Sequence, residues 1–177
     1  MVTNELYDFV HSGDLEATRK WLSVHPDDLN SDITDGYTPL HVASMFGHES
    51  IVSFLLAKQA LVNLSAFNPS QVTALHLAVC FRDEEVACRI ALNLIANGAE
   101  LNAVQEKGQT ALHHAIARGS LRLVEMLIDE GADPFFKDQL GRSPMDLVAN
   151  LASDLDQDSK LRNALKRAFS LSLEARQ

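Results

Sequence analysis

The chain has 177 residues, of which 46% are hydrophobic and 22% charged, so it can bury a sizeable core and is not disordered throughout. Its formal net charge of −9 disfavours binding to the phosphates of nucleic acids and to anionic membrane surfaces. Its two cysteines, Cys80 and Cys88, lack the spacing of a zinc site or a disulfide framework, which suits a reducing compartment.

The first residues do not resemble a secretory signal, because Glu5 and Asp8 interrupt the place of its apolar core. No stretch reaches the roughly 18 apolar residues that a transmembrane helix needs. We therefore expect a cytoplasmic protein with no membrane partner, and an extracytoplasmic one only if a signal peptide precedes the given sequence.

Five segments with a similar pattern follow one another, and each predicts two short helices joined by a turn. The first, "NELYDFVHSGDLEATRKWL", opens on Asn4, and the later ones open on Thr38, Thr73, Thr110 and Ser143. Successive openings are 34, 35, 37 and 33 residues apart. Each opening threonine precedes a helical stretch, where its hydroxyl can cap free backbone N–H groups.

The segments share a buried stripe, with leucine and alanine three residues apart in each first helix. Two short helices cannot bury their apolar faces alone, so neighbouring units must supply the rest of the core. The stripe residues are Leu40 and Ala43, Leu75 and Ala78, and Leu112 and Ala115.

The stretches "TPLHVASMFGHESIVSFLL", "TALHLAV" and "TALHHAIARGSLRLVEMLI" resemble ankyrin repeats over almost the whole chain. The resemblance implies an all-α fold, an ankyrin-type helix–turn–helix solenoid with projecting finger loops, in a single domain over residues 1–177. We expect repeats at about 1–34, 35–69, 70–106, 107–139 and 140–173, with atypical first and last repeats that cap the array. The last continues into a closing helix with a stripe of Leu161, Leu165, Ala168 and Phe169.

Three of the seven histidines, His41, His76 and His113, occupy the same place in successive segments. Neighbouring repeats lie about 10 Å apart, too far for these side chains to share a zinc ion. The resemblance implies instead that each bonds to the backbone of the neighbouring loop. No catalytic or phosphate-binding motif is present. We therefore expect no enzyme activity, no metal and no cofactor; a histidine- or metal-dependent enzyme is the less favoured alternative.

Three departures from the repeat pattern stand out. The distance from Thr73 to Leu94 is 21 residues, where the matching distance in two other repeats is 17. The four extra residues predict either tolerated length variation at an exposed turn or a turn that protrudes towards a partner. Gln71 stands where other fingers have glycine, so that finger is expected to turn differently. Phe135 and Phe136 stand where the family usually has an asparagine and a small residue, and are either packed under the next loop or exposed for binding.

The resemblance also implies that partners bind the concave face, at the finger tips and the exposed ends of the first helices. The Met45–Phe46 and Cys80–Phe81 pairs are interpreted as structural counterparts, one repeat apart, in one exposed patch. We predict a non-enzymatic protein-binding module, monomeric when free; the alternative is a dedicated inhibitor or immunity-type protein that blocks a partner enzyme. The predicted binding residues are Tyr37, Met45, Phe46, Val72, Cys80, Phe81, Gln109, Arg118, Phe135, Phe136 and Arg142.

Overall fold

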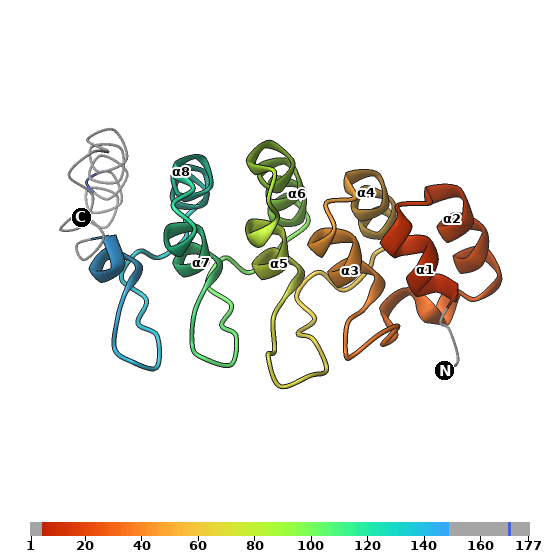
Figure 1. Cartoon of the computed structure of the whole chain (residues 1–177), viewed down its shortest axis with the longest axis horizontal. Coiled ribbons are helices and arrows are strands. Elements are labelled where there is room, and N and C mark those ends of the chain that lie inside the picture. The colour runs from red at the N-terminus through yellow and green to blue at the C-terminus, as the bar shows by residue number, and fades with distance from the viewer. Residues whose placement is uncertain (1–4, 149–169, 171–177) are drawn as a thin grey trace. The chain divides into compact units, whose positions relative to one another are not determined.

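The computed structural model describes residues 5–148 and Ser170, and it consists of helix pairs joined by long loops (Figure 1). The chain forms two compact units, residues 1–100 and residues 101–177. The first unit contains α1 (Glu5–Ser12), α2 (Leu15–Val24), the 3₁₀ helix η1 (Pro26–Asn30), α3 (Pro39–Met45), α4 (Glu49–Ala57), α5 (Ala74–Cys80) and α6 (Glu84–Ala96). The second contains α7 (Ala111–Ala117), α8 (Leu121–Asp129) and a helical stretch over 144–148. The predicted opening residue Asn4 and the predicted closing helix lie outside the described residues.

The predicted helix starts are confirmed. Thr38, Thr73 and Thr110 have extended backbones, and each forms a reciprocal capping box with the histidine three residues later. Three second helices begin in another way, because Asp14, Asp83 and Ser120 each accept a backbone N–H from the first turn of α2, α6 and α8. His48, at the start of α4, makes no such bond. None of the described helices is long and apolar enough to cross a membrane.

The buried stripe is also as predicted, since Ala43, Ala78 and Ala115 have no exposed surface. In the first unit α3 packs against both α1 and α5, and α4 packs against α6. Alanine at the contact lets these backbones approach closely, while the leucines three residues earlier fill the space between the pairs. The core of the first unit is therefore shared between successive repeats.

The four extra residues of the third repeat lie in a helix, so their predicted place in an exposed turn is wrong. The N-caps His48, Asp83 and Ser120 each follow the opening threonine by ten residues. The turn between the helices therefore has one length in these repeats. However, α6 has 13 residues, whereas α4 and α8 have nine each. Four residues are about one helical turn, so they lengthen α6 without rotating its buried face far from its neighbours.

The finger that ends at Thr73 is two residues longer than the others. The amide of Ala66 bonds to the carbonyl of Val72, six residues on, whereas Ile33 bonds to Tyr37, only four residues on. Gln71 nevertheless has φ +50°, in the same left-handed region as Gly36 at φ +85°. The finger thus turns differently through its length, whereas Gln71 itself keeps the left-handed backbone of the glycine it replaces.

Asparagines link successive repeats within each unit. The Asn63 side chain accepts the N–H of Glu100 at 2.8 Å and donates to the carbonyl of Gly98 at 2.9 Å. Asn30 accepts from Leu61, and Asn102 accepts from Asp133, at matching places. These bonds fix where each finger begins relative to the end of the following second helix.

Candidate functional site

Buried histidines hold the fingers in place. In His41 the ring atom Nδ1 accepts hydrogen bonds from the N–H and the hydroxyl of Thr38, at 3.3 and 2.8 Å. With Nδ1 acting as an acceptor, Nε2 must carry the proton, and it donates to the carbonyl of Val72 at 3.0 Å. Burial lowers the pKa of His41 to about 4, although the bond to Val72 opposes the shift. The ring is therefore neutral at physiological pH.

His113 is bound in the same way, through Nδ1 to Thr110 and through Nε2 to the carbonyl of Arg142 at 3.2 Å. Burial likewise lowers its pKa. The predicted bonds between these histidines and the neighbouring loop are thus confirmed for His41 and His113. Across residues 5–148, no three His, Cys, Asp or Glu side chains come together in a way that could hold a metal ion.

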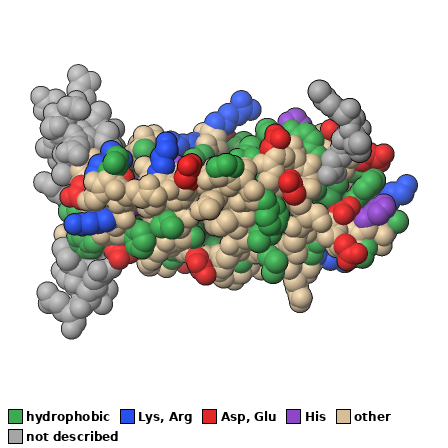
Figure 2. Space-filling view, turned by 90° about the horizontal axis from the view of Figure 1, so that it is seen from below, with side chains coloured by type: hydrophobic (Ala, Val, Ile, Leu, Met, Phe, Trp, Pro, Cys, Tyr) green, Lys and Arg blue, Asp and Glu red, His purple; other side chains and the backbone are tan. Residues whose placement is uncertain are grey.

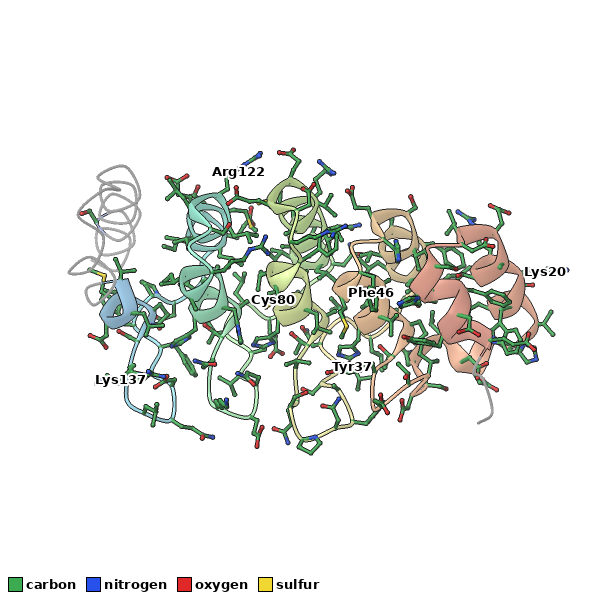
Figure 3. All side chains as sticks on the ribbon, in the orientation of Figure 1. Lys20, Tyr37, Phe46, Cys80, Arg122 and Lys137 are labelled. Carbon is green, nitrogen blue, oxygen red and sulfur yellow. The ribbon has the colours of Figure 1, made fainter. Side chains whose placement is uncertain are left out.

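Six of the predicted binding residues belong to the first unit, and we call them the Phe46 surface. Tyr37 and Val72 lie at the ends of fingers, directly before the N-caps of α3 and α5, whereas the other four lie at the C-terminal ends of these helices. Figure 3 labels Tyr37, Phe46 and Cys80. Phe46 and Cys80 are exposed, and the other four are half-buried. The Phe46 surface comprises Tyr37, Met45, Phe46, Val72, Cys80 and Phe81.

Phe46 and Phe81 occupy matching positions, as interpreted, since they cap the C-terminal ends of α3 and α5, but they leave these helices in different conformations. Phe46 leaves its helix with ψ 3°, and Gly47 then turns the chain at φ +76°. The third repeat has Arg82 at this place, and Phe81 leaves α5 in an extended conformation with ψ 137°. A side chain strains the left-handed region that glycine adopts freely, which explains the different exit.

The extended exit carries the Phe81 ring across to the preceding repeat. A Cβ atom added to Gly47 would collide with the Phe81 ring, so the ring covers this glycine closely. Phe81 is thus half-buried and not fully exposed as predicted, while still adjoining the turn that holds Phe46. The two phenylalanines do lie together, although for a different reason from the one predicted.

The first repeat contributes two aromatic side chains that were not among the predicted site residues. The Phe46 ring meets the His11 ring edge-on at 4.4 Å between centroids, and His11 lies 5.3 Å from Tyr7. Both belong to α1, one helical turn apart. The signal was present in the sequence, because Tyr7 stands at the position that a histidine fills in the middle repeats. These rings extend the apolar surface from Phe46 onto the first repeat.

The other five predicted residues belong to the second unit, and all five are half-buried. Phe135 and Phe136 are therefore neither packed away nor fully exposed. The guanidinium of Arg142 forms an ion pair with Asp138 at 2.9 Å. Burial alone would raise the pKa of Asp138, but the hydrogen bonds from Arg142 and Leu140 outweigh it and lower the pKa. Arg142 therefore has a structural role within its own finger. Gln109 and Arg118 complete this group.

Comparison with known proteins identifies the repeats. A family model described as ankyrin repeats (3 copies) matches residues 6–93, and one described as ankyrin repeats (many copies) matches residues 94–148. The chain is 33% identical over 127 residues to the probable 26S proteasome regulatory subunit p28 of Saccharomyces cerevisiae, which covers 71% of this chain and 53% of that protein.

Two further relatives are much longer proteins. Oxysterol-binding protein homolog 1 of Saccharomyces cerevisiae is 24% identical over 197 residues, covering 91% of this chain and 16% of that protein. The mitochondrial disaggregase of Bos taurus is 31% identical over 124 residues, covering 67% of this chain and 17% of that protein. The chain thus spans about half or less of the length of these relatives.

Proposed function

The chain belongs to the ankyrin-repeat family, whose repeats form a protein–protein interaction module, and we propose that it is a non-enzymatic module that binds its partner through the Phe46 surface. The observation that carries the proposal is the gathering of aromatic and sulfur-containing side chains at the ends of α3 and α5. Exposed aromatic side chains are the residues that most often dominate binding energy, and methionine adapts to varied partners.

Two further findings support a binding role. His41 and His113 use both ring nitrogens in structural hydrogen bonds, so neither offers a ready acid or base. The yeast relative is named as a probable regulatory subunit of the 26S proteasome, which fits a chain that works by binding another protein. The fingers of the second unit, with Gln109, Phe135 and Phe136, are proposed as a further contact region.

Substitution of Phe46 tests this proposal. Immobilised wild-type protein and the Phe46→Ala variant are each incubated with native lysate, and the retained proteins are identified by mass spectrometry. Leu92→Ala is the matched control, because Leu92 is 41% exposed on α6 and Phe46 is 36% exposed. We expect Phe46→Ala to lose a protein that the control retains, with a binding loss of about 2 kcal/mol or more.

The stability of both variants must be measured alongside binding. A half-exposed side chain should contribute less than about 1 kcal/mol to the free energy of unfolding, so both variants should remain folded. If Phe46→Ala retained every protein that the wild type and the control bind, the Phe46 surface would not be the binding site.

A further inference from the structure

We propose that the partner segment bound by the Phe46 surface carries apolar side chains flanked by lysine or arginine. This inference rests on the proposed function and adds the charge of the partner to it. It is carried by the apolar character of the Phe46 surface, by the charge of the unit that bears it, and by the arrangement of the first two fingers.

The acidic excess of the chain lies almost entirely in the first unit. Residues 1–100 contain 13 Asp and Glu but only 5 Lys and Arg, whereas residues 101–177 contain 11 and 10. From Trp21 to Ala57 there are five acidic residues and no lysine or arginine at all. The Phe46 surface therefore lies in a strongly negative unit. Figure 2 shows acidic side chains scattered among the hydrophobic ones towards the N-terminal end.

Acidic groups adjoin the Phe46 surface in the sequence and on the first finger. Asp35 is exposed at φ +46°, two residues before Tyr37. Asp8 is exposed on α1, directly after Tyr7, which belongs to the aromatic series that reaches Phe46. Two exposed carboxylates thus lie within two residues of aromatic side chains of this surface or its extension, and an apolar centre with charged residues around it is a usual arrangement of a protein interface.

The longer second finger places a further aromatic side chain beside Asp35. Phe67 is 60% exposed, and its amide N–H donates to the carbonyl of Gly36 at 2.8 Å. The side-chain amide of Asn68 donates to the carbonyl of Asp35, also at 2.8 Å. The two fingertips are thus bonded to each other through the backbone of Phe67 and through the side chain of the next residue, Asn68. An aromatic face and a carboxylate on neighbouring fingertips together favour a cation, through cation–π attraction and ion pairing.

A partner of the opposite charge is disfavoured by the same features. Acidic flanks would meet Asp8, Asp35 and the negative field of the first unit, which slows association and weakens binding. Basic flanks would instead be steered towards this surface, and this attraction weakens as salt screens it over about 10 Å at 0.1 M ionic strength.

Selection from a peptide library tests the charge of the partner. A random 16-residue display library is selected on the full chain, and peptides that still bind the Phe46→Ala variant are removed. The variant has the same net charge as the wild type, so this step discards peptides held only by general attraction to an acidic protein. We expect the remaining peptides to be enriched in lysine and arginine next to apolar residues.

The affinities of the selected peptides for the wild-type protein and for charge variants are then measured by titration. Asp35→Asn preserves the left-handed backbone, which asparagine tolerates, and Asp8→Asn changes only an exposed side chain. Each should weaken binding about 2- to 5-fold, with a smaller effect at high salt. Asp129→Asn is the control, because it removes the same charge from the end of α8 in the second unit and should leave binding unchanged.

The outcomes separate this inference from the proposed function. Peptides that depend on Phe46 but show no basic bias would contradict the predicted positive charge of the partner, and so would peptides that bind Asp35→Asn and Asp8→Asn as tightly as wild type. Either result leaves the proposed binding function standing. A selection that yields no peptide dependent on Phe46 would overturn both.

Discussion

Gly47 combines a left-handed backbone with an aromatic ring directly above it. Any side chain at this position meets the strain of φ +76° and also collides with the Phe81 ring. Gly119 has a similar φ of +74°, yet an added Cβ would meet nothing within 4 Å. The two glycines therefore separate backbone strain from the effect of the ring.

We predict that Gly47→Ala destabilises the protein more than Gly119→Ala. Gly119→Ala should cost about 1 kcal/mol from backbone strain, and Gly47→Ala about 2–4 kcal/mol because overpacking adds to the strain. Urea unfolding of both variants provides the measurement. Adding Phe81→Ala to Gly47→Ala should remove most of the difference, and equal costs for the two glycines would contradict the position of the ring.

The neutral state of His41 predicts how stability changes with pH. Its pKa in the folded protein is about 4, below the ordinary 6.5 that applies to the unfolded chain. Between these two pKa values the unfolded chain binds a proton at His41 and the folded protein does not. The contribution of His41 to the free energy of unfolding is therefore complete above pH 6.5 and is lost as the pH falls towards 4. The full effect is about 3 kcal/mol.

Urea unfolding at several values between about pH 7 and about pH 5 checks this prediction. The lowered pKa values of Asp138 and Asp146 act below their ordinary 3.8, so the histidines dominate this window. His41→Gln should be less stable overall but should show a weaker dependence on pH. An unchanged dependence in this variant would show that His41 is not the titrating group.

At the scale of single residues, the repeating histidines, threonines and alanines were predictable because each obeys a rule that recurs in the three middle repeats. Phe81 was not. Its position depends on Arg82, which replaces a turn glycine, and on Gly47 in another repeat. Alignment of the repeats treats Phe46 and Phe81 as equivalent, and only the backbone angles reveal the difference.

At the scale of helices and loops, the alternation of first and second helices was predictable from the sequence, since most of the described helices start at a capping side chain. The 3₁₀ helix η1, which has no such cap, was not predicted. Nor was the length of α6. An insertion between two helices can lengthen either the turn or the second helix, and Asp83 decides the matter by capping α6 at the usual distance from Thr73. The spacing from Thr73 to Leu94 alone does not distinguish a longer turn from a longer helix, whereas the capping residue does.

The asparagine links between repeats lead to a prediction at the same scale. Asn63→Ala removes both the acceptor for Glu100 and the donor to Gly98, and should cost about 1–2 kcal/mol in the free energy of unfolding. Asn63→Asp keeps the acceptor and loses only the donor, so it should cost about half as much. Chemical denaturation distinguishes the two variants, and equal costs would show that the bond from Glu100 contributes little.

At the scale of the whole molecule, we predict that the protein does not depend on a metal ion. Elemental analysis of the purified protein should find much less than one equivalent of zinc. Its melting temperature should be unchanged by a chelator. A metal ion bound to the folded state would stabilise it, so its removal would lower the melting temperature. One equivalent of tightly bound zinc would contradict the proposed non-enzymatic role and favour a histidine-based site.

The ring N–H groups of His41 and His113 also provide a natural spectroscopic label. Each is buried and bonded to a carbonyl of the next repeat, so it should exchange slowly with water and give its own proton signal in a nuclear magnetic resonance spectrum. Repeat arrays can open one part at a time, because each repeat contacts only its neighbours. Loss of one signal before the other would show which unit opens first, without any added dye.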